Sequence, residues 1–476
     1  MNRTDIIGRK KEIEILEKAL KEKEAQLLIV SGRRRVGKTF LVNSFFEDNF
    51  TFSLTATYNQ TLDFSLGLFN VQFNKYFNEF NEAPKNWGEA FSRLGMKLKA
   101  LPCDVKKIVF IDELPWFDHP GSNFVSYFES FRNNECIKID NLVFIVCGSK
   151  TSRIHHNLFT NKGGFYNRQT YKITLEPFSL KETQEFLTSR NVNYSHYDVA
   201  IAYMCMGGIP YYLKFIDGKL TLSENINKMF FEKNCYLNGE AEQLFRTLFE
   251  NVSVAKRIIE ALSNKRYGMT RKEISKAASY SEGGKLTDIL EDLMVSGFIS
   301  AFDNFSNVRK EKRYILTDLY SLFYFKFVKA NTQINESFWT NAYLARDVKE
   351  REGFSFELIC RLHINEIKKA LNILSVDTKV YSWNYYPEDG EEGAQIDLVI
   401  ERKDNMIDIC EMKFVESKYE ITKNYYDNCM NKIEKFSRFI KKRQSLRFVF
   451  ISTEGVKNNK YSNFVAQDLD IDIFFN

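Results

Sequence analysis

The chain has 476 residues and a formal net charge of +5, and its composition is 44% hydrophobic and 15% aromatic. This length is enough for three or four domains with large cores. Mean hydropathy is −0.35, no apolar run approaches the roughly 18 residues of a membrane span, and the N-terminus lacks a signal-peptide core, so we expect a cytoplasmic protein with no membrane contact.

Cysteine and histidine motifs for metal binding are missing from the sequence. The eight cysteines are scattered without a C-x-x-C pair, and the five histidines form no H-E-x-x-H motif. Several cysteines lie inside apolar runs, as reduced core cysteines do. A pI of about 8.5 is compatible with nucleic acid binding but is weak support by itself.

The first strong motif is a glycine-rich loop between a predicted strand and a predicted helix. An apolar run over 27–30 predicts the strand, and apolar positions between 40 and 46 predict the helix. A phosphate-binding P-loop requires this context, because backbone N–H groups and the helix N-terminus surround the phosphate oxygens. Lys38 would reach the β- and γ-phosphates of a nucleotide, and Thr39 would bind Mg²⁺. The loop residues are Gly32, Arg33, Arg34, Arg35, Val36, Gly37, Lys38 and Thr39.

A second motif supplies two carboxylates. The apolar run 108–111 predicts a buried parallel strand that delivers Asp112 and Glu113 at its carboxyl end. The pair follows the P-loop by about 70 residues, a spacing at which both motifs meet one Mg²⁺. Asp112 would hold the ion, and Glu113 would orient and deprotonate the attacking water.

A third apolar run over 142–148 predicts another buried strand, which ends at Ser149. Ser149 either senses the γ-phosphate or is an ordinary turn serine after a strand. Three buried strands with helical connections predict a doubly wound α/β sheet.

Residues 246–330 contain three helical segments followed by two short strands. Thr270 and Glu273 have the spacing of a capping box at the start of the second helix. The pattern predicts a winged helix-turn-helix, in which Lys285 and four basic residues of the wing would contact phosphates. The third helix also carries three acidic residues, so a protein-contacting winged helix is an alternative to a DNA-reading one.

The C-terminal part, 351–476, predicts a mixed α/β domain. Two strands flank the turn-rich tetrad 402–405 and should form a hairpin. If the hairpin folds about its centre, Asp397 lies nearly opposite Glu411, and Lys413 shares the face of Glu411. Charges on core strands cost several kcal/mol unless they are paired or metal-bound, so this cluster indicates a functional site.

The motifs resemble, in content and order, those of archaeal-type ATPases, STAND-class relatives of AAA+ proteins that are sometimes labelled DEXX-box ATPases. The C-terminal domain of that family is similar to a restriction endonuclease, and the resemblance covers essentially the whole chain. The motifs that carry it are Ile7-Gly8-Arg9 with Glu12, the glycine-rich loop, Asp112-Glu113-Leu114-Pro115, Gly148-Ser149 and Gly207-Gly208-Ile209-Pro210.

The resemblance implies roles for further residues of the nucleotide site. Ile7, Gly8 and Arg9 would lie against the adenine. Pro210 would pack near the base and couple nucleotide state to the position of the lid. Ser149 would be the sensor, and Arg168 would stabilise charge in the transition state, in cis or from a neighbouring subunit.

The C-terminal cluster resembles the PD-(D/E)xK nuclease pattern, with Glu357 as the acid on the helix. By this resemblance Asp397 and Glu411 bind Mg²⁺, and Lys413 activates water or stabilises the developing charge. An inactive nuclease fold that is kept for binding is the alternative.

The predicted fold is a multi-domain α/β protein that uses ATP and Mg²⁺. Its parts are a P-loop NTPase core of AAA+/STAND type over 1–178, a helical lid over 179–245, a winged helix-turn-helix over 246–330, a linker over 331–350 and a restriction-endonuclease-like domain over 351–476.

The functional hypothesis is an ATP-hydrolysing switch protein that binds DNA and cleaves it with its C-terminal domain. One rival is an ATP-dependent DNA- or protein-binding regulator with an inactive nuclease-like domain, capable of forming a homo-oligomer through the NTPase core. Another is a mobile-element- or defence-associated sensor that is triggered by a protein partner.

Overall fold

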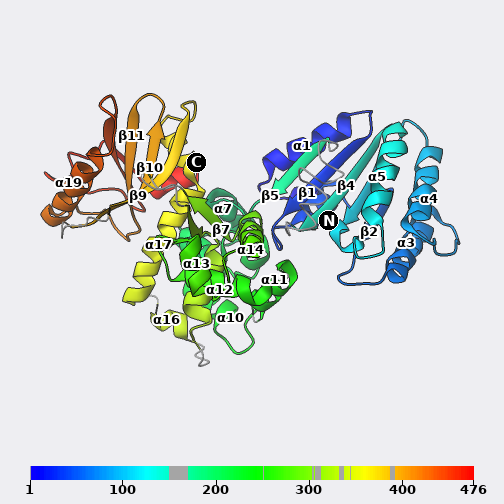
Figure 1. The fold of residues 1–476 in the computed structure, drawn as a ribbon, viewed down its shortest axis with the longest axis horizontal. Coiled ribbons are helices and arrows are strands. Elements are labelled where there is room, and N and C mark those ends of the chain that lie inside the picture. Colours follow the sequence, from blue (N-terminus) through cyan, green and yellow to red (C-terminus); the bar gives the residue numbers. More distant parts are fainter. Residues whose placement is uncertain are drawn as a thin grey trace. The chain divides into compact units, whose positions relative to one another are not determined.

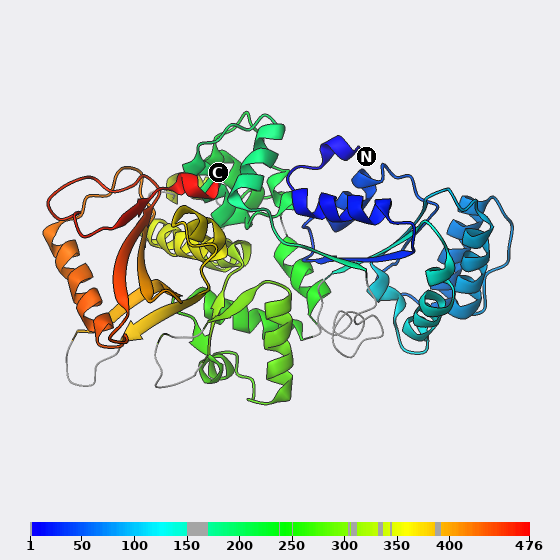
Figure 2. The same cartoon turned by 90° about the horizontal axis from the view of Figure 1, so that it is seen from above.

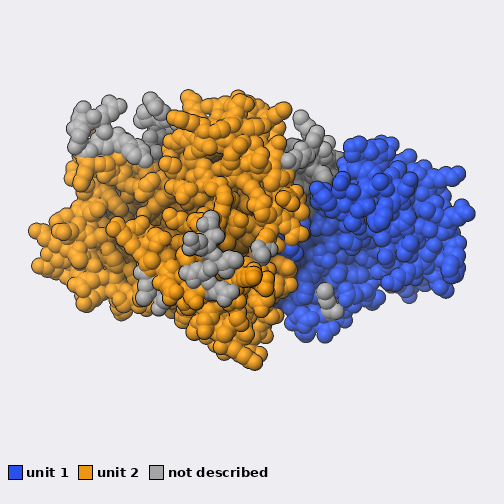
Figure 3. All heavy atoms as spheres, turned by 90° about the horizontal axis from the view of Figure 1, so that it is seen from below, with its two compact units in different colours: residues 1–177 blue, residues 178–476 orange. Residues whose placement is uncertain are grey.

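The computed structural model describes residues 2–149, 170–237, 239–249, 251–302, 305, 312–331, 337–342, 345–385 and 392–476. The chain forms two compact units, residues 1–177 (unit 1) and residues 178–476 (unit 2), which Figure 3 shows in blue and orange. Unit 1 ends one residue before the boundary predicted for the NTPase core.

Unit 1 is built on a five-stranded parallel sheet with the strand order β2-β3-β4-β1-β5. The strands predicted at 27–30, 108–111 and 142–148 are confirmed as β1, β3 and β4. The sequences of these strands are almost entirely apolar, because both faces of a parallel sheet are covered by other parts of the chain. The strands are β1 Gln26–Gly32, β2 Phe52–Thr55, β3 Lys107–Asp112, β4 Leu142–Ser149 and β5 Tyr171–Leu175.

Helices α3, α4 and α5 lie together on the β2 side of this sheet (Figure 1). They bury an aromatic core in which Trp87 packs edge-on against Phe117 and Phe124, with ring centroids 4.8 and 4.9 Å apart. Such pairs add to the stabilisation from apolar burial, and here they fix α4 against α5. The helices of unit 1 are η1 Arg3–Asp5, α1 Lys10–Lys21, α2 Lys38–Phe45, α3 Leu62–Phe77, α4 Trp87–Ala100, η2 Leu114–Phe117, α5 Phe124–Asn134 and η3 Cys136–Lys138.

Unit 2 begins with a run of helices that precedes a small three-stranded sheet. The sheet has the antiparallel order β6-β8-β7. The predicted capping box is confirmed at the start of α13, where Thr270 Oγ1 accepts the Glu273 N–H and Glu273 Oε2 accepts the Thr270 N–H. These elements are α7 Leu180–Ser189, α8 His196–Met206, α9 Pro210–Leu213, α10 Leu222–Phe230, α11 Glu240–Leu248, α12 Val252–Ser263, β6 Met269–Thr270, α13 Arg271–Ala277, α14 Gly284–Val295, β7 Ile299–Phe302, β8 Arg313–Leu316, α15 Leu319–Phe323 and η4 Tyr324–Val328.

The C-terminal part of unit 2 is a mixed five-stranded sheet in the order β13-β12-β11-β10-β9. Strands β9, β10 and β11 pair antiparallel, and β11, β12 and β13 pair parallel. The sheet lies between α17 on one face and α19 on the other (Figure 2). The elements are α16 Phe338–Ala342, α17 Arg346–Leu362, α18 Ile364–Ala370, β9 Thr378–Tyr385, β10 Ala394–Arg402, β11 Met406–Lys413, α19 Lys423–Ser437, β12 Ser445–Ser452, β13 Gln467–Leu469 and η5 Ile471–Phe474.

The segment predicted as a linker, 331–350, contains ordered helix in its described residues. Trp339 of α16 is 3% exposed, and Asn227 Oδ1 of α10 accepts its backbone N–H at 2.9 Å. Helix α17 already begins at Arg346, and Val348 in its first turn is buried. Among the described residues, no helix is long and apolar enough to cross a membrane.

A buried histidine joins the first helix of unit 2 to the junction of α17 and α18. His363 Nε2 accepts the N–H of Leu180, and His363 Nδ1 donates to the carbonyl of Ile359, at 3.1 and 2.9 Å. Both ring nitrogens are satisfied in the neutral form. Burial lowers the pKa of His363, although the Ile359 carbonyl and the charges of Glu366 and Glu182 oppose this shift.

We predict a loss of stability in acid that depends on His363. The unfolded chain takes up a proton below about pH 6.5, whereas the folded imidazole resists protonation, so stability present at neutral pH is lost as the pH falls. The free energy of unfolding of unit 2, measured by denaturant titration between pH 7.5 and 5, should depend less on pH in His363→Gln than in the wild type. Parallel pH profiles for the two proteins would contradict this assignment.

Candidate functional site

The glycine-rich loop runs from the end of β1 into α2. Gly32 packs so closely on the Leu175 carbonyl of β5 that a Cβ atom would collide with it. Gly37 has φ +93°, in the left-handed region that favours glycine, and it precedes the first residue of α2. The loop backbone therefore turns tightly at both ends and directs the N-terminus of α2 toward its centre.

Lys38 is buried in this loop. Its Nζ atom donates to the carbonyl of Arg33 at 3.1 Å, and the residue is 5% exposed. A buried ammonium needs acceptors, and here a loop carbonyl supplies one of them. The cation is thus held inside the loop, where phosphate oxygens would bind.

Thr39 and Asp112 meet at the same edge of the sheet, although they are 73 residues apart in the chain. Thr39 Oγ1 donates to Asp112 Oδ2 at 2.7 Å, and the N–H of Glu113 donates to Asp112 Oδ1 at 2.9 Å. Hydroxyl and carboxylate oxygens are the ligands that Mg²⁺ prefers, so this pair fits the predicted ion.

Glu113 takes the left-handed conformation, with φ +49°, directly after β3. A non-glycine residue there costs of the order of 1 kcal/mol and is held by its surroundings. The turn packs tightly, because a Cβ on Gly148 of β4 would lie 2.8 Å from the ring of Pro115. The backbone therefore fixes Glu113 beside Asp112 while leaving the residue half-buried.

The strand register aligns the three predicted motifs. Gly32 at the end of β1 is the partner of Ser149 at the end of β4, and Ile111 of β3 is the partner of Val146. The carboxyl ends of all three strands thus share one edge. The Ser149 side chain and Arg168 lie outside the described residues.

The Ile7-Gly8-Arg9 motif contacts the loop through its arginine. Arg9 is 6% exposed, and its Nη2 atom donates to the Val36 carbonyl at 3.2 Å. Gly8 and Arg9 both have positive φ, and Ile7 is half-buried. A role of Arg9 in supporting the P-loop backbone was not visible in the sequence, because the two segments are 27 residues apart.

Cys147 is a further residue of this site that sequence reasoning assigned only to the core. Burial raises the pKa of its thiol well above the ordinary value, and the charge of the neighbouring Asp112 adds to the shift. A neutral thiol therefore lies beside the carboxylate. Pro210, in unit 2, is the first residue of α9 and follows Gly207, Gly208 and Ile209, a position at which proline is compatible with the start of a helix.

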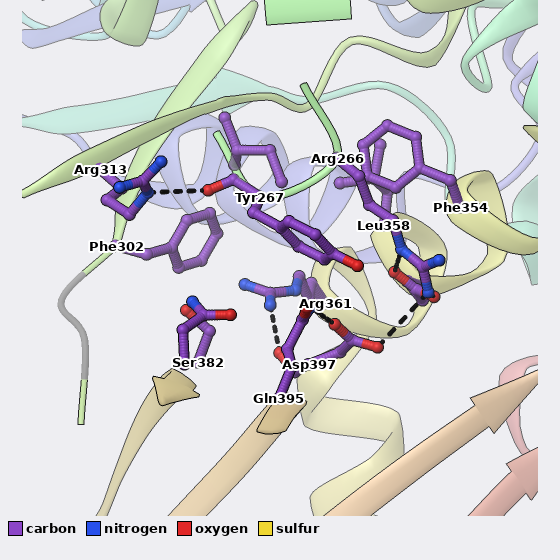
Figure 4. A pocket seen from close by; sticks show the side chains of 13 residues that line it. Arg266, Tyr267, Phe302, Arg313, Phe354, Leu358, Arg361, Ser382, Gln395 and Asp397 are labelled. Atoms are coloured by element: carbon purple, nitrogen blue, oxygen red, sulfur yellow. Dashed lines mark hydrogen bonds and ion pairs between the residues drawn. The ribbon is translucent and has the colours of Figure 1, made fainter. Parts of the chain in front are cut away.

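In the C-terminal domain, Glu357 of α17 and Asp397 of β10 share a pocket (Figure 4). Both carboxylates contact Arg266, from the turn between α12 and β6. Arg266 Nε donates to Glu357 Oε2 at 3.1 Å, Nη2 donates to Glu357 Oε1, and Nη2 lies 3.6 Å from Asp397 Oδ2. Burial first, and the charge of Asp397 second, raise the pKa of Glu357 to about 8, although Arg266 opposes the shift.

Glu411 and Lys413 lie together on β11, with Lys413 Nζ 3.4 Å from Glu411 Oε1. The predicted hairpin is confirmed, since Leu398 pairs with Cys410, which makes Asp397 and Glu411 neighbours across the strands. A bulge between Ile396 and Val399 interrupts the pairing of β10 with β9 at Asp397.

Two donors from α19 hold the Glu411 carboxylate. Lys432 Nζ and the Tyr425 hydroxyl donate to its two oxygens, each at 2.9 Å. Lys432, Lys413 and these hydrogen bonds lower the pKa of Glu411 despite its burial. Lys432 is therefore turned inward to this carboxylate rather than outward to solvent.

In the arrangement that the structure shows, the carboxylates of Glu357, Asp397 and Glu411 do not form a metal-binding site. Arg266 forms ion pairs with Glu357 and Asp397, and Lys432 forms an ion pair with Glu411. Within the described ranges there is no group of three or more His, Cys, Asp or Glu side chains that could hold an ion. Cations of the protein itself neutralise the predicted Mg²⁺ ligands.

Residues 6–216 match the family described as an ATPase domain predominantly from Archaea. An uncharacterized protein of Methanocaldococcus jannaschii is 24% identical over 430 residues, which are 90% of this chain and 91% of the relative. An uncharacterized ATP-binding protein of the same organism is 50% identical over 42 residues, 9% of this chain and 71% of the relative. The solved Walker-type ATPase of Pyrococcus abyssi has a TM-score of 0.49 and 18% identity over 68% of this chain and 97% of its own.

The chain therefore carries an archaeal-type P-loop ATPase domain, which supports ATP binding and hydrolysis. The matched residues include the glycine-rich loop, Asp112 and Glu113. The match ends at residue 216, before the three-stranded sheet and the C-terminal domain.

We predict that Thr39→Val weakens nucleotide binding only when Mg²⁺ is present. Valine keeps the shape of threonine but removes the oxygen that lies 2.7 Å from Asp112. Titration of a fluorescent ATP analogue should show at least a tenfold loss of affinity with Mg²⁺ and little change with EDTA. Thr39→Ser, which keeps the hydroxyl, is the matched control and should bind like the wild type.

Proposed function

We propose that this chain is an ATP-driven switch that binds DNA, with hydrolysis in unit 1 and the response in unit 2. The observation that carries the proposal is the hydrogen bond between Thr39 and Asp112, which joins the P-loop to the end of β3. The match of residues 6–216 to an ATPase domain supports it. ATP and Mg²⁺ are the proposed ligands of this edge of the sheet.

The proposed roles follow from where each side chain lies. Lys38 binds the β- and γ-phosphates, and the loop N–H groups and the α2 N-terminus add further donors. Thr39 and Asp112 hold Mg²⁺, which when bound neutralises charge on the phosphate oxygens. Glu113 orients a water and accepts its proton as the water oxygen bonds to the γ-phosphorus and the bond to ADP breaks.

The remaining nucleotide contacts are proposed from the family resemblance. Ile7, Gly8 and Arg9 lie against the adenine, Pro210 reports nucleotide state to the helices that follow it, and Ser149 contacts the γ-phosphate. Arg168 stabilises the transition state, in the same chain or across a homo-oligomer contact between NTPase cores.

We predict that Glu113→Gln separates ATP binding from hydrolysis. A general base contributes about 100- to 10,000-fold to rate, so the steady-state ATPase rate should fall by that factor while ATP affinity is retained. Lys38→Ala should lose both binding and hydrolysis, because it removes the buried cation of the loop. A wild-type ATPase rate in Lys38→Ala would overturn the assignment of the site.

Helices and strands of residues 252–316 support DNA as the proposed partner. The order of α12, β6, α13, α14, β7 and β8 is consistent with the proposed winged helix-turn-helix, in which α14 would enter the major groove. Lys285 is exposed at the start of α14, but Asp288 and Glu291 are exposed on the same helix. These carboxylates favour a protein trigger as the alternative partner of this surface.

Charge-neutralising variants of α14 distinguish the two partners. If α14 lies against DNA, Lys285→Gln should weaken DNA binding and reduce its salt dependence by about one counterion, while Glu291→Gln should strengthen binding. Fluorescence anisotropy with duplex DNA at two salt concentrations measures both effects, and the ATPase rate with and without DNA measures the coupling. Affinities unchanged in both variants would exclude α14 as a DNA contact and favour the protein partner.

A second candidate is an ATP-dependent regulator whose nuclease-like domain does not cut DNA. The observation that favours it is the pairing of Glu357 and Asp397 with Arg266 and of Glu411 with Lys432. With these carboxylates neutralised, the C-terminal domain binds a partner without cleaving it. DNA cleavage by the same domain requires a different arrangement of these side chains.

A further inference from the structure

One end of the C-terminal sheet is built from three segments that are far apart in the chain. They lie at the start of β9, at the turn between β10 and β11, and before β12, and they are residues 375–379, 401–405 and 441–445. The N–H of Lys403 donates to the Asp377 carbonyl at 3.0 Å. The N–H of Ser445 donates to the Asn405 carbonyl at 2.9 Å. Backbone hydrogen bonds therefore hold the three segments side by side.

These segments carry more cations than carboxylates. Together they contain six lysines and arginines and three acidic residues, which is a net charge of +3. Each of the three carboxylates has a partner within the same segments. The partners are Lys403 for Asp377, Arg402 for Asp404 and Gln444 for Glu401. The acids of this end are thus already satisfied, and the excess positive charge remains.

The excess charge lies in three consecutive residues of the turn before β12. Lys441, Lys442 and Arg443 are all exposed, and none of them forms an ion pair within the part of the chain that the structure describes. The turn is nevertheless fixed. The Lys441 N–H donates to Gln444 Oε1 at 2.9 Å, and Gln444 Nε2 donates to Glu401 Oε1 at 3.0 Å. Three adjacent like charges repel each other, so a fixed turn of this kind favours an anionic partner.

The other end of the same sheet has the opposite character. Strand β11 runs from Met406 to Lys413, which at about 3.3 Å per residue is a length of about 23 Å. Beyond its far end lies a hollow that is lined by four carboxylates, those of Glu416, Glu454, Asp470 and Asp472. A polyanion would be repelled from this hollow and attracted to the end that carries Lys441.

We propose that this end of the sheet binds the phosphate backbone of DNA. The binding surface, which we name the basic edge, consists of Lys379, Lys403, Lys441, Lys442 and Arg443. It extends across the ends of four neighbouring strands, from β9 to β12, or about 14 Å. One DNA strand carries about four phosphates over that axial length. The basic edge therefore matches a short stretch of backbone in both charge and size.

The inference rests on the proposed function, because it takes DNA as the partner, and it adds a second contact outside α14. Lysine and arginine side chains that bind phosphates release counterions and fix the position of a protein on the duplex, but they read no sequence. The basic edge should therefore strengthen binding to any duplex equally. Sequence preference, if the protein has one, would come from another surface.

The test is the salt dependence of DNA binding by the full chain, measured by fluorescence anisotropy with two duplexes of unrelated sequence. Lys441→Gln/Lys442→Gln/Arg443→Gln should lower the slope of log affinity against log salt by about three. At low salt its affinity should be at least tenfold weaker than that of the wild type, by the same factor for both duplexes. Lys441→Arg/Lys442→Arg/Arg443→Lys keeps the charges and should bind like the wild type.

The matched control removes three exposed cations from the same domain but away from the basic edge. Lys418→Gln/Lys457→Gln/Lys460→Gln changes the net charge by the same amount and should keep the slope of the wild type. A wild-type slope in the basic-edge triple variant would overturn the inference. An equal loss in the control variant would also overturn it, because the effect would then come from net charge alone. All variants should keep the ATPase rate of the wild type without DNA, which shows that they are folded.

The same measurements separate this inference from the proposed function. If Lys285→Gln weakens DNA binding and the basic-edge triple variant does not, only the basic edge is wrong. A wild type that binds neither duplex would overturn both the basic edge and DNA as the partner. Binding to phosphatidylglycerol vesicles that depends on the basic edge, without binding to either duplex, would assign this surface to a membrane instead.

Discussion

The parallel alignment of β1, β3 and β4 is the constraint on which the nucleotide site depends. It places the loop after β1 and the acids after β3 at one edge, so that Thr39 and Asp112 are hydrogen-bonded across 73 residues of chain. The contact also needs Gly32, because the loop leaves β1 against the Leu175 carbonyl of β5. A fold that aligned these strands differently would hold the same motifs without forming the site.

The buried acids of unit 1 and of the C-terminal domain differ in the charge of their hydrogen-bond partners. Asp112 accepts hydrogen bonds from the Thr39 hydroxyl and from the Glu113 N–H. Both donors are neutral, so they do not cancel the charge of the carboxylate. Glu357 and Glu411 instead have an arginine and a lysine as partners. A carboxylate held by neutral dipoles still attracts a metal, whereas one held by a cation must first lose that partner. The two sets of buried acids therefore differ in the charge of their partners.

The features that could be predicted from the sequence are mostly those that depend on residues close together in the chain. The P-loop context, the hairpin at 402–405 and the capping box of Thr270 and Glu273 depend on neighbours a few residues apart, and all three have the predicted local geometry. The contacts of Arg266 and Lys432 could not be predicted, because they join segments whose proximity is set only by packing. Helix α16 was missed for a similar reason, since Trp339 becomes a core residue only when α10 lies beside it.

The first residues of unit 2 are held by backbone hydrogen bonds at two places. Strand β5 ends at Leu175, the N–H of Phe178 is bonded to the Gly208 carbonyl, and the N–H of Leu180 is bonded to His363. Within five residues the chain is therefore anchored first to the turn that precedes Pro210 and then to the α17–α18 junction. The entry of the chain into unit 2 is thus a fixed point of that unit, because its first residues tie together two segments, the turn at Gly208 and the helix that carries Glu357, that are about 150 residues apart in the chain.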